Sequence, residues 1–270
     1  MKQLRERYGN WAMVAGSAVG LGESYCAALA KLGFNLFMID NRNDELMSLS
    51  NKLAKDYGIQ TIPFCIDLFQ KDVAEKIMEK TSSIDIRLMI YVAAYSQIKK
   101  FTNYTIDDID HYININVGTP IKLVHSFSNR LISKKQTGGI LLMSSLAGLL
   151  GMQYIVPYAA SKAFNWNLAE SLNHELKPFN IDVMACIAGA TATQAYLGTN
   201  PQYGFIKPQV QQPSEVVKQA LQKLGKKALF IPGFSNRLNY FILTRILPRK
   251  LASFLANKTM KKMYSGNVAD

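Results

Sequence analysis

Six short apolar runs recur along this chain, and segments long enough for a helix separate them. The runs are Trp11–Ala15, Leu36–Ile39, Thr61–Ile66, Ile86–Val92, Gly139–Met143 and Ile181–Cys186. Each has the length of a buried strand, and strands that alternate with helices pair in parallel through helical crossovers. The pattern therefore predicts an α/β fold, with a doubly wound parallel sheet and helices on both of its faces.

A glycine-rich turn, with glycines at Gly16, Gly20 and Gly22, follows the first apolar run and precedes a helical pattern that stops at Gly33. Glycines lack a Cβ atom, so the backbone can turn tightly and aim N–H groups of a helix start at a phosphate. In such a sheet, the first strand-to-helix turn receives the pyrophosphate of a dinucleotide. The turn therefore predicts a dinucleotide-binding, Rossmann-like sheet.

Tyr158 and Lys162 are four residues apart in the segment Tyr158-Ala-Ala-Ser-Lys162. On a helix they share one face, so an ammonium lies close to a phenol. A nearby cation lowers the tyrosine pKa from its usual ~10 toward the range that general acid–base catalysis needs. The pair is a candidate for proton transfer, although the same spacing occurs on solvated helices.

Together, these features resemble the short-chain dehydrogenase/reductase family over about residues 10–200, including the spacing of the glycines. The catalytic serine of that family lies thirteen positions before its tyrosine, where this chain has Ser145. The tyrosine and the lysine fall on Tyr158 and Lys162, and the catalytic asparagine falls on Asn116. Taken singly, Ser145 is also explained as a strand-end cap and Asn116 as an ordinary helix residue.

The resemblance implies an NAD(P)-dependent oxidoreductase that transfers a hydride at C4 of the nicotinamide. In this reaction Tyr158 exchanges a proton with a carbonyl or alcohol, whose oxygen Ser145 polarises. Lys162 holds the nicotinamide ribose and lowers the Tyr158 pKa, and Asn116 positions a water that links Lys162 to a proton relay. No metal ion is required.

Cofactor contacts are likewise implied by family position, at the ends of the predicted strands. They fall on Gly16, Ser17, Gly20, Leu21, Gly22, Asp40, Arg42, Asp67, Leu68, Ala93, Tyr158, Lys162, Gly189, Thr191 and Thr193. Thr193 is expected at the nicotinamide carboxamide, and Asp67 and Leu68 at the adenine. Capping roles explain Thr193 and Asp67 as well.

Asp40, which ends the second run, bears on the choice of cofactor. A carboxylate there accepts hydrogen bonds from both hydroxyls of the adenosine ribose and repels a 2′-phosphate, so the sequence favours NAD over NADP. Neutral Val19, before the second glycine, agrees with this choice. Arg42 argues the other way, because a guanidinium can pair with a phosphate. Alternatively, Asp40 only caps the next helix.

Two segments depart from the family pattern. Tyr91–Ala94 stands where the family usually has Asn-Asn-Ala-Gly, so we expect altered packing on the adenosine side of the cofactor. Ala188-Gly189 stands where the family has Pro-Gly, which predicts a less constrained turn beside the nicotinamide.

Length and composition indicate one domain, because 270 residues that are 49% hydrophobic can form one sizeable core. We divide it into residues 1–229, the Rossmann-like catalytic part, and residues 230–270, a basic C-terminal extension. The three cysteines have neither disulfide nor zinc spacing, and the charged N-terminus does not resemble a signal peptide. A cytoplasmic protein is therefore expected. The apolar region 139–160 is better explained by a strand, a turn and a helix start than by a membrane span.

The net charge of +12 is concentrated at the C-terminal end, where twelve Lys/Arg from Lys207 onward face Glu215 and Asp270, a balance of 12 − 2 = +10. The segment Phe230–Met263 is also amphipathic, a pattern typical of helices that lie in a membrane interface. A helix pair packed on the body, or a subunit contact, explains it too.

A weaker resemblance to 3-oxoacyl and 17-beta-hydroxysteroid reductases implies an apolar ketone or alcohol substrate, and the family implies a homodimer or homotetramer. The polar stretch Pro201–Pro213 is expected to form a loop over a site.

Other function classes remain open at this stage. A nonenzymatic dinucleotide sensor typically loses the reactive tyrosine and lysine, which this chain keeps, and sugar-nucleotide epimerases space their glycines differently. A membrane-surface binding protein is a further alternative. A nucleic-acid partner is not expected, because the chain has no recognition motif or aromatic platform.

Overall fold

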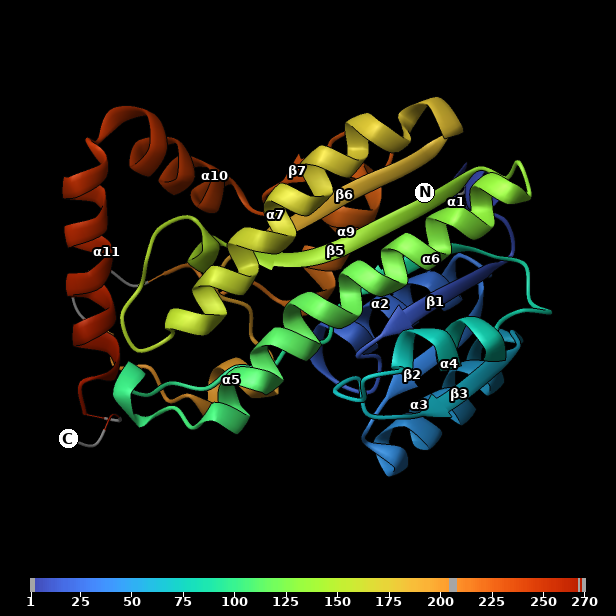
Figure 1. The fold of residues 1–270 in the computed structure, drawn as a ribbon, viewed down its shortest axis with the longest axis horizontal. Helices are drawn as coiled ribbons and strands as arrows, with labels where there is room; N and C mark the ends of the chain where they lie inside the picture. Colours follow the sequence, from blue (N-terminus) through green and yellow to red (C-terminus); the bar gives the residue numbers. More distant parts are fainter. Residues whose placement is uncertain (1–2, 204–207, 267, 269–270) are drawn as a thin grey trace.

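A seven-stranded parallel sheet, in the order β3-β2-β1-β4-β5-β6-β7, forms the centre of the computed structural model, which describes residues 3–203, 208–266 and 268 (Figure 1). The strands are β1 (Trp11–Ala15), β2 (Asn35–Asp40), β3 (Thr61–Cys65), β4 (Ile86–Tyr91), β5 (Gly138–Ser145), β6 (Ile181–Ala188) and β7 (Leu229–Phe230). Strand order runs outward in both directions from β1 and β4, so the predicted doubly wound sheet is confirmed.

Helices connect the strands and continue beyond the sheet. The α-helices are α1 (Gln3–Tyr8), α2 (Gly20–Lys31), α3 (Asn43–Tyr57), α4 (Val73–Lys80), α5 (Ile106–Ile113), α6 (Thr119–Ser133), α7 (Val156–Leu176), α8 (Gln194–Gly198), α9 (Pro213–Lys223), α10 (Phe234–Phe241) and α11 (Arg249–Tyr264). Short 3₁₀ helices are η1 (Phe101–Asn103), η3 (Leu146–Gly148) and η4 (Lys177–Phe179), and π-helical turns are η2 (Asn114–Gly118) and η5 (Ile242–Ile246).

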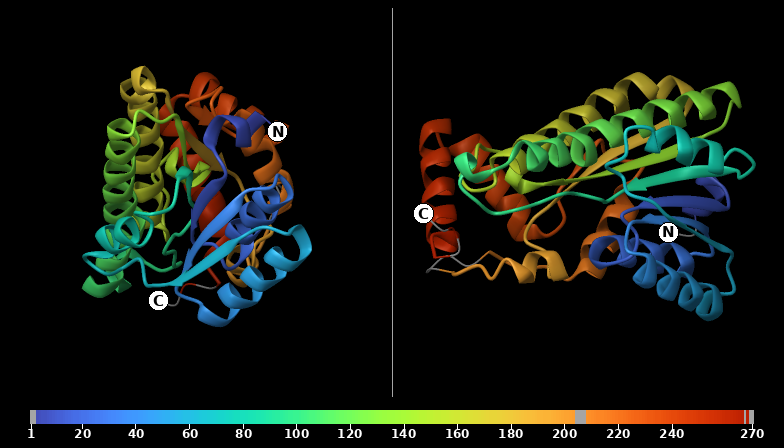
Figure 2. Two further views of the ribbon diagram at one scale, coloured as in Figure 1. Left: turned by 90° about the vertical axis from the view of Figure 1, so that its right-hand side faces the viewer. Right: turned by 60° about the horizontal axis from the view of Figure 1, so that its bottom comes forward.

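Helices cover both faces of the sheet, which explains why β1, β2, β4, β5 and β6 are mostly buried, continuous apolar runs. The edge strand β3 is only partly buried, because no further strand pairs with its outer side. Successive side chains of a strand point to opposite faces. In β1, Ala12 and Val14 belong to the core under α2, α3 and α9, whereas Met13 and Ala15 belong to the core under α4, α6 and α7. The two helical layers on either side of the sheet are visible in Figure 2.

The edge strand β7 was not predicted. It has two residues, Leu229 and Phe230, paired with Ala185 and Cys186 of β6. Two residues are too short for a periodic signal, so only the neighbouring strand defines this one. β7 lies across the expected boundary between residues 229 and 230, and that division stays a prediction.

The apolar region 139–160 forms most of β5, the turn η3 and the start of α7, as expected. No helix within the described residues is long and apolar enough to cross a membrane. The loop expected at 201–213 lies partly outside the described residues, at 204–207.

The expected amphipathic helices of the C-terminal segment are α10 and α11, which Figure 1 shows beyond the carboxyl ends of β5 and β6. Tyr240 of α10 packs on Trp166 of α7, with ring centroids 5.8 Å apart. Ala252 and Met260 of α11 are buried. One side of this helix pair therefore packs on the body, next to the end of the sheet where ligands bind in such folds.

Candidate active site

Close contacts with backbone atoms shape the glycine turn at Gly16 and Gly22. Gly16 has φ +80°, and a Cβ atom there would lie 2.5 Å from the Ala93 nitrogen. A Cβ atom on Gly22 would lie 1.7 Å from the Gly16 carbonyl oxygen. The predicted contacts Ser17, Gly20 and Leu21 complete this turn and the first turn of α2. Its close packing leaves room only for glycine and directs N–H groups of the α2 start outward, which fits a pyrophosphate.

Asp40 lies at the end of β2, beside the glycine turn. Its Oδ2 accepts a 2.9 Å hydrogen bond from the Ala18 backbone N–H, and its Oδ1 accepts one of 3.1 Å from the Arg42 N–H. Arg42 itself is the N-cap of α3, so Asp40 does not cap that helix in the usual way. The exposed Arg42 guanidinium lies 3.9 Å from Glu45. Asp40 is thus held in a fixed position at the ribose end of the expected site.

The predicted contacts after β3 and β4 lie at the same edge of the sheet. The Asp67 carboxylate accepts a hydrogen bond from the Phe69 N–H, a local turn that matches its capping alternative. The buried Leu68 is held through its carbonyl oxygen by the Thr119 hydroxyl. The Ala93 N–H donates to the Ala15 carbonyl, which draws β4 toward the glycine turn.

The segment after β6 approaches the glycine turn from the other side. A Cβ atom on Gly20 would lie 3.3 Å from the Thr193 methyl group. Thr193 Oγ1 accepts a hydrogen bond from the Tyr196 N–H and so caps α8, in agreement with the capping role considered for it in the sequence analysis. Gly20, Thr193 and Gln212 are among the residues that line a cavity of about 540 Å³ between these segments.

A buried amide pair that the sequence analysis missed fixes this segment. A Cβ atom on Gly189 would lie 2.5 Å from the Asn236 side chain. Asn236 Nδ2 donates to Gln211 Oε1 at 2.8 Å, and Gln211 is bridged to Thr191 through the backbone. Because α10 carries Asn236, this helix holds the turn after β6 where the family's proline is missing.

Tyr158, Ser145 and Lys162 converge at the carboxyl end of β5. Ser145 ends β5 and its Oγ accepts a 3.2 Å hydrogen bond from the Ala147 N–H. Lys162, only 3% exposed, donates from Nζ to the Met143 carbonyl at 3.0 Å. Its Nζ lies 5.4 Å from the centroid of the Tyr158 ring, on the ring face.

Burial controls the pKa values of this group in the protein alone. Burial raises the pKa of Tyr158 to about 12, and a hydrogen bond with Ser145 offsets part of the rise. Burial also lowers the pKa of Lys162 to about 8. Desolvation therefore dominates the Tyr158 pKa in the cofactor-free protein, and the effect of Lys162 on this pKa stays a prediction.

Asn116, fully buried in the π-helical turn η2, ties three segments together. Its Oδ1 accepts a 2.7 Å hydrogen bond from the Tyr95 N–H, and its Nδ2 donates to the Tyr95 carbonyl and to Ser161 Oγ. Tyr91, the bulky residue that departs from the family pattern, donates its hydroxyl hydrogen to the Ile115 carbonyl at 2.7 Å. The departure therefore supports the π-helical turn that carries Asn116.

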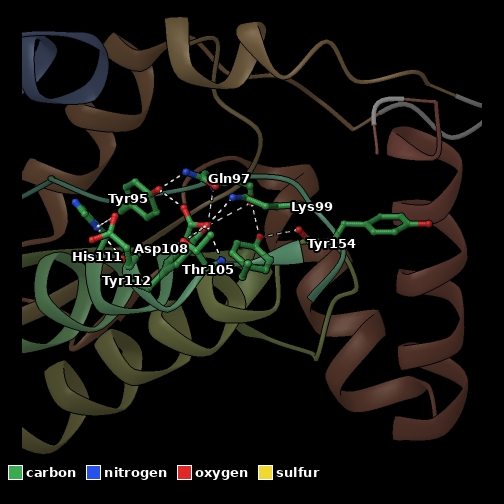
Figure 3. Close-up of polar contacts among 10 residues, drawn as sticks. Tyr95, Gln97, Lys99, Thr105, Asp108, His111, Tyr112 and Tyr154 are labelled. Atoms are coloured by element: carbon green, nitrogen blue, oxygen red, sulfur yellow. Dashed lines mark hydrogen bonds and ion pairs between the residues drawn. The ribbon is translucent and has the colours of Figure 1, made fainter. Parts of the chain in front are cut away.

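A polar network secures the segment after β4 against α5 (Figure 3). Asp108 accepts hydrogen bonds from Lys99 Nζ at 2.6 Å and from the Tyr95 hydroxyl at 2.8 Å. It also forms a reciprocal capping box with Thr105 at the start of α5. The Lys99 ammonium holds the pKa of Asp108 well below its usual range. Because Tyr95 binds Asn116 through its backbone, this network positions Asn116.

An apolar cluster lies on the other side of Tyr158. Its buried members include Ile155, Met260 and Tyr264, and partly buried residues around it include Ile98, Met152, Tyr154 and Tyr158. Asn257 of α11 accepts a 2.8 Å hydrogen bond from the Gln153 N–H, which fixes α11 to the loop before Tyr158. Tyr158 thus stands between a polar group and an apolar surface.

Comparison with known proteins identifies the family. The family model described as short chain dehydrogenase matches residues 10–204, the part of the chain that contains the glycine turn, Asn116, Ser145, Tyr158 and Lys162. This chain is a short-chain dehydrogenase. It is an NAD(P)-dependent oxidoreductase, as the sequence predicted.

Individual relatives cover most of the chain. A 7beta-hydroxysteroid dehydrogenase of Mediterraneibacter gnavus is 30% identical over 237 residues, 87% of this chain and 90% of the relative. A very-long-chain 3-oxoacyl-CoA reductase of Rattus norvegicus is 28% identical over 268 residues, 96% of this chain and 83% of the relative. A solved structure from work on 7beta-hydroxysteroid dehydrogenase stereoselectivity has a TM-score of 0.86 and 27% identity, and covers 94% of this chain and 98% of its own.

Proposed function

We propose that this short-chain dehydrogenase interconverts a ketone and a secondary alcohol on an apolar substrate, with NAD as its cofactor. The observation that carries the proposal is the position of Tyr158. Its side chain lies against Lys162 on one side and against the apolar cluster with Met260 and Tyr264 on the other. A carbonyl at Tyr158 therefore has a proton donor within reach and an apolar surface for the rest of the molecule.

Each polar group near Tyr158 has a separate task in this proposal. Tyr158 gives its hydroxyl proton to the substrate oxygen in reduction and takes it back in oxidation. Ser145 donates a hydrogen bond to the same oxygen and so polarises it. Lys162 holds the ribose of the cofactor, which supplies the hydride when bound. Asn116 keeps the π-helical turn in register with α7 through Ser161.

The preference for NAD rests on Asp40. Two backbone N–H groups hold its carboxylate at the end of β2, so it cannot turn away from an incoming phosphate. A fixed negative charge there repels the 2′-phosphate of NADP and accepts hydrogen bonds from ribose hydroxyls. Arg42, the residue that favours NADP, projects to the surface beside Glu45.

The substrate class rests on the surroundings of Tyr158 and on the relatives. Steroid and long acyl substrates appear in the names of the two relatives above, and both are predominantly apolar. Methionine side chains such as Met152, Met260 and Met263 are flexible and adapt to bulky apolar ligands. A steroid or a 3-oxoacyl compound is therefore the proposed substrate.

The test pairs fluorescence titration with NADH and NADPH with NADH oxidation against a panel of steroid, 3-oxoacyl and small polar ketones. We expect tighter binding of NADH and turnover of the apolar ketones. Binding of NADH without turnover of any ketone or alcohol would favour the sensor alternative instead.

Peripheral contact with a membrane is a second proposal, favoured by the outer faces of α10 and α11. Phe234, Leu238 and Phe241 are spaced on one side of α10, opposite the buried Asn236, and are 46–73% exposed. On α11 the exposed apolar residues are Leu251, Phe254 and Leu255, opposite the buried Met260 and Tyr264. Both helices thus present an apolar stripe away from the body.

The charge of this surface favours anionic lipid as its partner. Seven Lys/Arg lie between Arg237 and Lys262 without an acidic residue among them. A symmetric contact between two copies would bring these cations together, whereas a lipid surface with negative headgroups attracts them. Sedimentation with vesicles containing phosphatidylserine is expected to fall strongly for Phe254→Ser and little for Phe179→Ser, an exposed phenylalanine outside this segment. Equal sedimentation with uncharged vesicles, or dimerisation lost in Phe254→Ser, would contradict the lipid assignment.

Two family expectations remain proposals. We expect a homodimer or homotetramer, which size-exclusion chromatography with light scattering measures, and a cytoplasmic location, which fractionation of cells measures.

A further inference from the structure

Asn165 is a buried polar side chain that the proposed mechanism does not use. It lies on α7, is 3% exposed, and its Nδ2 donates a 3.2 Å hydrogen bond to the Asn116 carbonyl oxygen. Its Oδ1 is inaccessible to solvent and has no hydrogen-bond partner among the described residues. Leaving a buried acceptor without a hydrogen bond is unfavourable, so this oxygen requires a donor.

Lys162 lies one helical turn before Asn165 on α7, so the two side chains leave the helix on the same side. An ammonium has three hydrogens to donate, and Lys162 Nζ gives one of them to the Met143 carbonyl. Further acceptors would stabilise this buried ammonium, because a buried charge needs hydrogen bonds. The same side of α7 therefore carries an ammonium with donors to spare and, one turn on, the Asn165 acceptor that lacks a donor.

We propose that Asn165 is a positioning residue for proton transfer, which holds the Asn116 carbonyl with Nδ2 and a buried water molecule, shared with Lys162, with Oδ1. The water accepts a hydrogen bond from Lys162 Nζ and donates one to Asn165 Oδ1, so Asn165 gains the missing donor and Lys162 a second acceptor. No covalent bond changes in this arrangement.

This inference rests on the proposed function, since it concerns the environment of the same lysine. Asn165 touches neither substrate nor cofactor and acts through Lys162 and Asn116. By fixing them it sets the pH at which Lys162 loses its proton, and with it the pH dependence of turnover. The π-helical turn η2 suits this role, because such turns interrupt the regular α-helical hydrogen-bond pattern.

The test replaces Asn165 by Leu, which has the same branched arrangement of heavy atoms and no polar atom, and by Ser, which keeps a hydroxyl and leaves space for water. For Asn165→Leu we expect kcat to fall roughly 10- to 100-fold, with KM nearly unchanged and a shifted pH profile of kcat, since general acid–base terms have this size. Asn165→Ser is expected to recover most of the rate. Asn173→Leu is the matched control, because Asn173 lies on the same helix and donates to the Val183 carbonyl.

A purely structural role predicts a different result. Asn165→Leu would then lower the melting temperature as Asn173→Leu does and leave the pH profile of kcat unchanged, which overturns the proposal. A high-resolution crystal structure supplies a readout that does not depend on turnover. Water bridging Asn165 Oδ1 and Lys162 Nζ supports the proposal even if no substrate is turned over, and a direct protein donor to Oδ1 refutes it even if the enzyme is active.

Discussion

The cofactor end and the catalytic end of this site are held in shape by different kinds of contact. At the cofactor end, close backbone contacts at Gly16 and Gly22 shape the turn and leave no room for a side chain at these two positions. At the catalytic end, the side chains of Asn116 and Lys162 are themselves hydrogen-bonded to groups far apart in the sequence, which are the Tyr95 backbone, Ser161 Oγ and the Met143 carbonyl. The glycine positions of the turn tolerate almost no substitution, whereas the side-chain hydrogen bonds of the catalytic end involve many residues.

This difference explains what each end contributes. The glycine turn recognises charge and shape common to all dinucleotides, for which fixed N–H groups suffice. Proton transfer requires a donor whose pKa and position are adjusted together, and only titratable side chains in a defined environment provide that. Substitutions at the two ends should therefore separate binding from turnover.

The largest expected effect is at the catalytic end. Tyr158→Phe removes the proton donor and leaves the glycine turn untouched, so we expect kcat to fall by about 10²- to 10⁴-fold with unchanged NADH affinity. Steady-state kinetics and a fluorescence titration with NADH measure the two quantities. Undiminished turnover would show that another group transfers the proton.

A comparable loss of binding is expected at the cofactor end for Gly22→Ala. The added methyl would lie 1.7 Å from the Gly16 carbonyl, so the turn must open at a cost of about 1–3 kcal/mol of stability. NADH binding should weaken far more than for Gly266→Ala, where a Cβ atom meets nothing within 4 Å. If both variants bind NADH equally, the glycine turn does not bind the cofactor.

Lys162→Met tests the catalytic end through the pH dependence of protein stability. Burial lowers the pKa of Lys162 to about 8 in the folded protein, from 10.5 for the free group. Between pH 8 and pH 10.5 the unfolded chain binds more protons at Lys162 than the folded protein does. The contribution of Lys162 to the free energy of unfolding therefore rises with pH in this range. We therefore expect the cofactor-free Lys162→Met protein to be the more stable one below pH 8, with the difference shrinking toward pH 10.5. Denaturant unfolding across this range measures it, and a difference independent of pH would contradict the buried, depressed lysine.

The smallest effect is expected for Asp40→Ala, which changes selectivity rather than binding itself. Loss of the carboxylate should raise NADPH affinity relative to NADH by several-fold, because the repulsion of a 2′-phosphate disappears. Asp44→Ala, an exposed carboxylate in the first turn of α3, is the control. An unchanged NADH-to-NADPH ratio in Asp40→Ala would remove Asp40 as the selector.

Sequence reasoning succeeded where the signal is local. Most strands are buried apolar runs, which periodicity predicts. The glycines of the turn are close to one another in the sequence, and so are Tyr158 and Lys162, so spacing predicted both motifs. The two-residue strand β7 and the pair Gln211–Asn236 depend on contacts across the fold, and no pattern near them indicates these contacts.

The Tyr158 pKa shows the same limit. Spacing places an ammonium near the phenol, but which atom it faces and how deeply both are buried are set by packing. Asn165 was missed for a related reason. A polar residue inside a helix gives no sign in the sequence that it is buried against another helix.

The most direct test of the account is transfer of deuterium from NADH labelled at C4 to an apolar ketone, followed by mass spectrometry of the alcohol. The account predicts that the label appears on the carbinol carbon with the wild-type protein and is nearly absent with Tyr158→Phe. Tight binding of labelled NADH without transfer to any steroid or 3-oxoacyl ketone would contradict it.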